Sequence, residues 1–192
     1  MVRLSRGFFA RDTALVARNL LGSELVRVLD GDVLKGRIVE TEAYYGEEDP
    51  PSHASSGRTG RSRIMWDEPG LAYVYLIYGI HLMFNVVTES SGVPGAVLVR
   101  GVEPLEGIEG MKERRDGAPV ESVADGPGKL TKAFGIGKTE NGEDLVESGE
   151  LWLEEGKVFA GDDIESSGRI GISRGKEEEF RFYLAGSKFV SR

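Results

Sequence analysis

The chain contains no cysteine, and histidine is nearly as scarce, with only His53 and His81 among 192 residues. The missing thiols exclude thiolate catalysis, disulfides, iron–sulfur clusters and zinc held by cysteine. Two histidines alone cannot build a three-histidine metal site, although a magnesium site made of carboxylates stays open on composition. These absences already remove several enzyme classes.

Long hydrophobic runs are missing too. Charged or polar residues at positions 11, 12, 18 and 19 interrupt the apolar stretch near the N-terminus, and no later segment is long enough to span a membrane. Without a signal peptide or membrane span, we expect an intracellular protein, in the cytoplasm or nucleoid. Linkers, internal repeats and low-complexity tracts are absent as well, so residues 1–192 are expected to form one domain.

Basic residues are outnumbered, because 24 Lys and Arg against 32 Asp and Glu give a formal net charge of -8. At first sight this excess argues against a nucleic-acid partner. The acids concentrate in residues 140–156 and 162–165, however, whereas residues 57–63, 112–115 and 126–138 are locally basic. A molecule with one acidic and one basic face fits this pattern, and plain solvated loops fit it equally well.

Local patterns predict a helix and then a hairpin at the start of the chain. Asp12 can cap a helix over residues 12–21, which carries an apolar stripe of Leu and Val and stops at Gly22. The segment that follows, up to the tyrosine pair "YY", reads as two strands joined by an Asp-Gly turn at Asp30 and Gly31.

The remaining segments mix strands and helices without a regular alternation. Residues 71–79 and 95–104 are rich in β-branched and aromatic residues, which predicts two strands. Helices are expected to begin at Pro104 and at Pro127, the second one ending near Gly135. Short strands are predicted at residues 151–156, 170–173 and 180–186. This order favours a mixed α+β domain built on an antiparallel sheet.

The strand "RIVETEAYY" places Glu40, Glu42 and Tyr44 on one face of an otherwise apolar segment. Carboxylates on a face that should be buried and apolar break the local rule, and such departures are where function is expected. The alternative is an outer face exposed to solvent. A glycoside hydrolase that uses both glutamates fits poorly, because side chains two apart on a strand lie about 7 Å apart and project in parallel.

Tyrosines concentrate in the segment "AYVYLIYG". Tyr73 and Tyr75 point the same way on a strand, and Tyr78 comes at or beyond the strand's end, where its ring could project outward. Core packing is the ordinary role of strand aromatics, but each buried hydroxyl needs a partner. Signatures of P-loops, serine nucleophile elbows, His-Glu zinc helices and dinucleotide-binding loops are all missing. The candidate chemistry is therefore limited to carboxylate, water, arginine and aromatic rings.

Taken together, the segments resemble one known family. The stretches "GRIVETEAYYG", "SHASSGRTGRSRIMW", "AYVYLIYGIH", "FNVV", "AVLVRGVEPLEG", "GPGKLTKAFGI" and "RFYLAGSKFVS" occur in family order from about Leu4 to Val190. They resemble the alkyladenine (3-methyladenine) DNA glycosylases, whose vertebrate members excise alkylated purines and hypoxanthine. So many ordered matches make the resemblance specific.

The resemblance implies a single compact α+β domain, with a curved antiparallel sheet surrounded by helices and with no cofactor or metal. The implied partner is double-stranded DNA with a damaged purine, bound by a monomer. The implied reaction flips out 3-methyladenine, 7-methylguanine, hypoxanthine or ethenoadenine and hydrolyses its glycosidic bond. A glutamate rather than a lysine at the catalytic position implies attack by water, without a Schiff base or lyase step.

On the matching positions, the resemblance implies a catalytic pair and a base pocket. Glu42 looks like the general base that activates water, with Arg100 beside it to hold that water or the deoxyribose-phosphate. Tyr44 resembles one wall of the pocket, with His53 and Tyr75 as the opposite wall. Aromatic walls favour alkylated purines, which are often cationic or electron-poor, through stacking and cation–π attraction.

The resemblance also implies residues that hold DNA and select the base. Tyr78 is similar to the family's intercalating wedge, with Ile80 beside it, and an inserted ring offsets part of the lost stacking. Asn85 is similar to the residue that crowds the exocyclic amine of guanine. Ile170 and Ile172 belong to the segment "RIGI", which lends backbone contacts near the base. The expected DNA-backbone contacts are Arg58, Arg61, Arg63 and Lys129.

Two features depart from the family's pattern. The arginine loop is shorter than in several relatives, and His81 stands where some have tyrosine. With the net charge of -8, this predicts weak non-specific DNA binding that is lost early as salt rises. One alternative function stays open: a damaged-DNA-binding module that has kept the pocket and lost catalysis. The retained Glu42 and Arg100 speak against it.

Overall fold

The computed structural model describes residues 2–175 and 177–191. In this part of the chain, four α-helices accompany an eight-stranded sheet. The helices are α1 (Arg6–Phe9), α2 (Thr13–Asn19), α3 (Ile108–Arg114) and α4 (Pro127–Phe134). The strands are β1 (Glu24–Leu29), β2 (Asp32–Tyr44), β3 (Ala72–Ile77), β4 (His81–Val87), β5 (Ala96–Glu106), β6 (Leu151–Glu154), β7 (Ile164–Ser167) and β8 (Arg181–Leu184).

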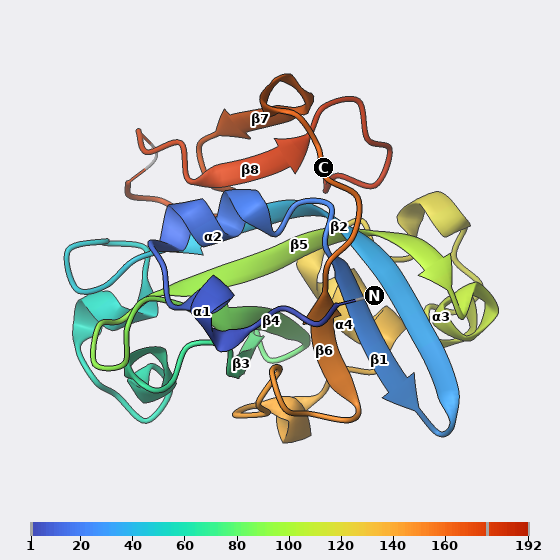
Figure 1. Cartoon of the computed structure of the whole chain (residues 1–192), viewed down its shortest axis with the longest axis horizontal. Coiled ribbons are helices and arrows are strands. Elements are labelled where there is room, and N and C mark those ends of the chain that lie inside the picture. Colours follow the sequence, from blue (N-terminus) through green and yellow to red (C-terminus); the bar gives the residue numbers. More distant parts are fainter. Residues whose placement is uncertain (1, 176, 192) are drawn as a thin grey trace.

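The sheet follows the strand order β3-β4-β5-β2-β1-β6, and its pairings are antiparallel. β8 pairs with the second half of β2 and with β7. In Figure 1, α1 and α2 lie in front of the sheet and α4 lies behind it, so helices cover both faces. The prediction of a mixed α+β fold on an antiparallel sheet is confirmed.

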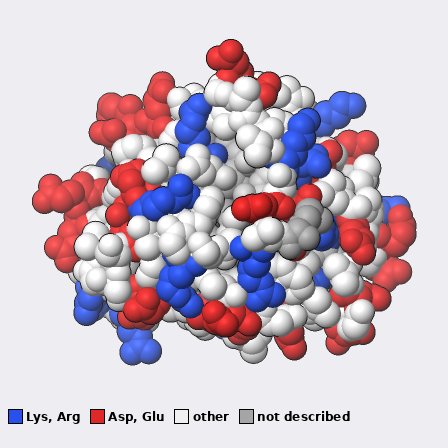
Figure 2. Space-filling model, viewed as in Figure 1, with Lys and Arg blue, Asp and Glu red and all other residues white. Residues whose placement is uncertain are grey.

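The core lies between the sheet and these helices. Phe9, Phe84 and Phe134 are fully buried in it, and α4 turns its Leu130 and Ala133 side chains toward the same core. In the described residues, no helix combines the length and hydropathy needed to cross a bilayer. Figure 2 shows acidic and basic side chains interspersed on the face that carries α1 and α2, so the two signs are not separated on that face.

Three local predictions are confirmed. The helix expected over residues 12–21 is α2, the hairpin after it is formed by β1 and β2, and the helix expected from Pro127 is α4. Asp12 caps α2 by accepting a hydrogen bond from a backbone N–H of its first turn at 2.9 Å. The turn between β1 and β2 has φ of 54° at Asp30 and 89° at Gly31, as a two-residue hairpin turn requires. α4 begins at Pro127 and ends before Gly135, whose φ is 61°.

The prediction of a helix that begins at Pro104 is wrong. β5 continues through Pro104 to Glu106, and α3 starts only after Gly107, whose φ is 69°. Pro104 lacks the N–H that a strand ladder uses, but it pairs with Gly36 beside a register shift in β2. An irregularity of this kind tolerates proline in a strand.

The prediction of a strand over residues 170–173 is also wrong, because these residues form a loop. The strand in this part of the chain is β7, the polar segment Ile164–Ser167, which pairs with β8. Neither β7 nor β4 was predicted from local patterns. β7 has no apolar alternation, and its pairing partner is supplied by the tertiary fold.

Candidate active site

Glu40 and Glu42 lie in the second half of β2, between β5 and β8. Both residues have a relative exposure of 0%. The alternative of an outer face exposed to solvent is therefore wrong. The register of β2 against β5 shifts on both sides of Glu40, and a bulged strand bends and re-aims its side chains.

Three hydrogen-bond donors surround the Glu42 carboxylate. Its Oε1 accepts from the Ile170 backbone N–H at 2.7 Å. Its Oε2 accepts from the Tyr44 hydroxyl at 2.9 Å and from Arg100 Nη1 at 3.1 Å. A carboxylate can accept about four such bonds, so Glu42 keeps an acceptor position for one more donor.

The Glu40 carboxylate accepts more hydrogen bonds from the protein than the Glu42 carboxylate does. Its Oε1 accepts from Arg100 Nε at 3.0 Å, Arg181 Nε at 2.6 Å and Ser191 Oγ at 2.8 Å. Its Oε2 accepts from the Ser191 N–H at 2.6 Å. Glu40 thus joins two arginines to the C-terminal segment, and it does not pair with Glu42 around a substrate bond as a glycoside hydrolase would require.

A pocket of about 280 Å³ opens beside the Glu42 network. Glu42 lies behind the pocket wall, while its three partners Tyr44, Arg100 and Ile170 line the pocket themselves. The structure brings several other predicted site residues to the same pocket. These are His53, Tyr75, Tyr78 and Ile172.

Asn85 lies at a small extension of this pocket. The extension measures about 20 Å³ and shares Tyr44, His53 and Tyr75 with the main pocket. Asn85 is 3% exposed, and its amide nitrogen donates to the Tyr73 carbonyl at 3.0 Å. This bond fixes the Asn85 side chain at the wall of the extension.

His53 is held in the pocket by tyrosines. Its Nδ1 lies 2.7 Å from the Tyr73 hydroxyl, and its ring meets Tyr75 edge to face with centroids 4.5 Å apart. Burial and then the charge of Arg61 lower the pKa of His53 below its usual value. A neutral imidazole can either accept from the Tyr73 hydroxyl at Nδ1 or donate to it, according to its tautomer.

The groups around Glu42 keep their protons. Burial and then the charge of Glu42 raise the pKa of Tyr44 well above its ordinary value, so its hydroxyl stays a donor. The same two causes raise the pKa of Tyr75 to about 12. Burial opposes the charge of Arg100, but Glu42 and Glu40 outweigh it and raise the pKa of that guanidinium.

Tyr78 stands at the tip of the β3–β4 hairpin, where it is 81% exposed and its neighbour Ile80 is 74% exposed. The φ angles are 53° at Tyr78 and 74° at Gly79. The left-handed region is unusual for a bulky aromatic residue, and strain of this kind is found at functional sites. Two apolar side chains thus project from a narrow tip beside the pocket.

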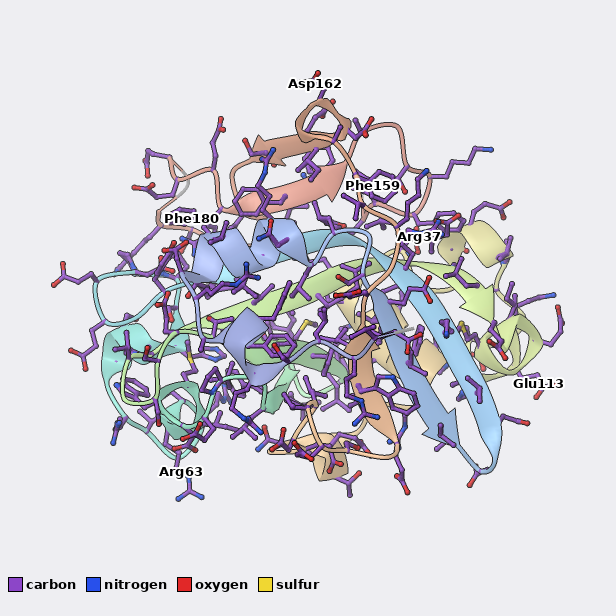
Figure 3. The ribbon with its side chains drawn as sticks, viewed as in Figure 1. Arg37, Arg63, Glu113, Phe159, Asp162 and Phe180 are labelled. Carbon is purple, nitrogen blue, oxygen red and sulfur yellow. The ribbon has the colours of Figure 1, made fainter. Side chains whose placement is uncertain are left out.

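The arginines of the loop after β2 are placed differently from one another. The Arg58 guanidinium lies 5.2 Å from the centroid of the Trp66 ring. Arg61 is near enough to the pocket for its charge to act on His53. Arg63 is exposed and points away from the body of the protein (Figure 3).

Lys129, the fourth predicted DNA-backbone residue, lies on α4 and outside the pocket. Its ammonium group pairs with Asp125 at 2.8 Å. Lys129 lines a separate groove of about 480 Å³, which contains Ile80 and shares His81 with the pocket. The structure therefore brings Glu42, Arg100 and the predicted pocket residues together, whereas Arg63 and Lys129 lie outside the pocket.

Sequence reasoning missed several residues of this site. Tyr73 could have been found, because it shares a strand face with Tyr75. Arg169 begins the segment "RIGI", for which only backbone contacts were predicted, and its side-chain pairing with Asp49, 120 positions away, has no local signal. In the described part of the chain, no three His, Asp or Glu side chains are grouped to hold a metal ion.

Three relatives are similar to the chain over nearly its whole length, and each bears the name "Putative 3-methyladenine DNA glycosylase". The protein of Carboxydothermus hydrogenoformans is 45% identical over 189 residues, which cover 98% of both chains. That of Chlorobaculum tepidum is 45% identical over 100% of this chain and 92% of its own. That of Clostridium perfringens strain 13 is 44% identical over 100% of both. These similarities place the chain among DNA glycosylases.

Residues 7–188 match the sequence profile of the methylpurine-DNA glycosylase (MPG) family. The chain belongs to this family. The resemblance drawn from the ordered motifs is therefore confirmed.

Proposed function

We propose that the protein is a monofunctional DNA glycosylase of base excision repair, which acts as a one-domain monomer on double-stranded DNA containing an alkylated or deaminated purine. The observation that carries the proposal is the Glu42 carboxylate, held by three donors directly behind an aromatic pocket. The shared name of the relatives supports the same substrate class.

The target base enters the pocket after it leaves the DNA stack. The pocket volume of about 280 Å³ suits a single planar base, because typical ligand pockets begin at about 300 Å³. Tyr44 forms one wall, and His53 and Tyr75 form the other. A cationic alkylated purine gains stacking and cation–π energy between these rings, of about 1–3 kcal/mol per stacked base.

Hydrolysis then breaks the bond between C1′ and the purine nitrogen, and the electron pair leaves with the base. The sugar gains oxocarbenium character, which the Glu42 carboxylate stabilises. A water molecule at the open acceptor position of Glu42 adds its oxygen to C1′ and gives a proton to the carboxylate. A base that is cationic through alkylation leaves as a neutral molecule without a further proton. A neutral base such as hypoxanthine must also gain one.

The experiment that tests this proposal measures base release from duplexes that each contain one modified purine. The panel is 3-methyladenine, 7-methylguanine, hypoxanthine and ethenoadenine, with an undamaged duplex as control. Free base is expected from the duplexes with a modified purine and none from the undamaged one. Selective binding to damaged duplex with no release from any of them would favour the silent damaged-DNA-binding module. If the protein neither binds the damaged duplexes nor releases a base from them, both functions are contradicted.

Tyr78→Asn is expected to move stability and DNA binding in opposite directions. Asparagine tolerates the left-handed backbone that Tyr78 adopts, so the free energy of unfolding should rise by up to about 1 kcal/mol. The lost ring should weaken binding to lesion duplex by about 1–3 kcal/mol. Urea unfolding and titration of a labelled duplex measure the two effects.

The matched control is Asp30→Asn, in the turn between β1 and β2, where Asp30 also has a positive φ of 54°. It should leave lesion binding unchanged. Binding by Tyr78→Asn equal to that of wild type would mean that the exposed hairpin tip is not the DNA wedge.

Asn85→Ser is expected to weaken discrimination against guanine-type bases, because it shortens the side chain at the pocket extension. Release of 7-methylguanine relative to 3-methyladenine should rise by about 10-fold, the effect of a small change in pocket size. The control Asn141→Ser removes another side-chain bond to β3, the one that Asn141 accepts from the Val74 N–H. An unchanged ratio in Asn85→Ser would contradict the selective role of Asn85.

A further inference from the structure

The loop of residues 168–175 supplies the Ile170 N–H that donates to Glu42, yet it lacks regular structure. β7 ends at Ser167, and β8 begins at Arg181. Among the described residues, the loop makes no backbone–backbone hydrogen bond. Its position beside Glu42 must therefore be fixed by side chains.

Arg169, the residue before Ile170, provides this fixation. Its side chain has 0% exposure, and its two terminal nitrogens each donate to one oxygen of Asp49 at 2.7 Å. Arg169 Nη1 also donates to the Ala43 carbonyl at 2.8 Å. Ala43 lies between Glu42 and Tyr44 on β2, so the guanidinium binds the very stretch of strand that carries both side chains.

The same guanidinium supports Tyr44 from behind. Its carbon lies 4.8 Å from the centroid of the Tyr44 ring and 5.3 Å from that of Phe180. Phe180, labelled in Figure 3, directly precedes β8. Burial opposes the charge of Arg169, but Asp49 outweighs it and raises the pKa of the guanidinium. The cation is therefore permanent.

Asp49 connects the ion pair to a third part of the pocket, the turn after β2. Its Oδ2 accepts from the Tyr45 N–H at 2.9 Å, which fastens the turn after β2 to the end of that strand. This turn leads directly to Pro51 and His53 on the pocket wall. Three separate segments that line the pocket, namely the end of β2, the turn after it and the loop of residues 168–175, thus converge on one ion pair.

We propose that Asp49 and Arg169 form a positioning pair, which holds the Ile170 N–H against Glu42 and the Tyr44 ring at the pocket wall. This inference rests on the proposed glycosylase function and adds to it two residues that touch neither the base nor the water. A bidentate guanidinium with a third bond to a carbonyl cannot be replaced by an ammonium group, which is a point charge. A misplacement of about 1 Å in a catalytic group can cost on the order of 100-fold in rate.

The test compares Asp49→Asn, Arg169→Lys and Arg169→Met with wild type in two measurements on one 7-methylguanine duplex. The first is the single-turnover rate of base release, and the second is the Kd for the duplex. Each variant is expected to lose about 10- to 100-fold in rate, with a much smaller change in Kd. Arg169→Lys should retain more activity than Arg169→Met. The double variant Asp49→Asn/Arg169→Lys should be no slower than the slower single variant, because both act on one contact.

Thermal unfolding and a matched variant separate positioning from folding. Arg27 is also a buried arginine, 5% exposed and paired with Glu140 at 3.0 Å, but it lies on β1, outside the pocket. Arg27→Lys should lower Tm and keep the wild-type rate. If Asp49→Asn and Arg169→Met are folded and release base at the wild-type rate, measured well below their Tm values, the positioning inference is overturned. The proposed function is not affected by that result. Absence of base release by wild type itself would instead overturn the proposed function.

Discussion

Glu42→Gln is expected to lower the single-turnover rate of base release by about 10²- to 10⁴-fold, because an amide cannot take a proton from the attacking water. Binding of lesion duplex should persist, since the pocket walls Tyr44, His53 and Tyr75 are unchanged. The amide can direct its oxygen to Tyr44 and Arg100, but its NH₂ group then faces the Ile170 N–H. Two opposed donors should cost about 1–3 kcal/mol in the free energy of unfolding.

The matched control for this variant is Glu154→Gln. Glu154 is a buried glutamate of β6 that accepts from Lys35 at 2.6 Å, and it lies outside the pocket. Its variant should lose stability and keep the wild-type rate of base release. Full activity in Glu42→Gln would remove Glu42 from the role of general base.

Arg100→Met is expected to cause the largest loss of stability, about 3–5 kcal/mol in the free energy of unfolding, because it removes the cation shared by two buried carboxylates. Arg100 is 7% exposed and donates to Glu40 at 3.0 Å and to Glu42 at 3.1 Å. After the change, Glu40 keeps Arg181 and Ser191, whereas Glu42 keeps only neutral donors. Urea unfolding measures the loss.

The comparison is Arg181→Met, which removes the other arginine of Glu40 and leaves Glu42 untouched. It should cost less stability and keep base release. Adding Glu42→Gln to Arg100→Met should restore part of the lost stability, since it neutralises the unpaired charge, so the two changes should not be additive. If Arg100→Met and Arg181→Met lose equal free energy of unfolding, sharing of Arg100 by two buried carboxylates is not what makes it important for stability.

Much of the site follows from short stretches of sequence. The alternation of Glu40, Glu42 and Tyr44 on one strand, and that of Tyr73 and Tyr75 on another, is a property of the backbone and can be recognised in the letters alone. The Tyr78–Gly79 turn is likewise local. The ordered motifs then carried the family assignment, which the comparisons confirm.

The parts that could not be predicted depend on residues far apart in the chain. Glu40 meets Ser191 across 151 positions, and Arg169 meets Asp49 across 120. β5 continues through Pro104 beside a register shift in β2, where a strand tolerates proline. A proline at the start of a charged segment ordinarily predicts a helix, and the deciding contact lies on another strand.

In the proposed reaction, a water molecule activated by Glu42 hydrolyses the glycosidic bond of a flipped base. The most direct measurement uses wild-type protein and one duplex with a single 7-methylguanine, and it quantifies both free base and strand integrity. We expect free 7-methylguanine in equal amount to alkali-labile abasic sites, with no strand break before alkali. Bound but intact substrate, or strand breaks without alkali, would contradict it.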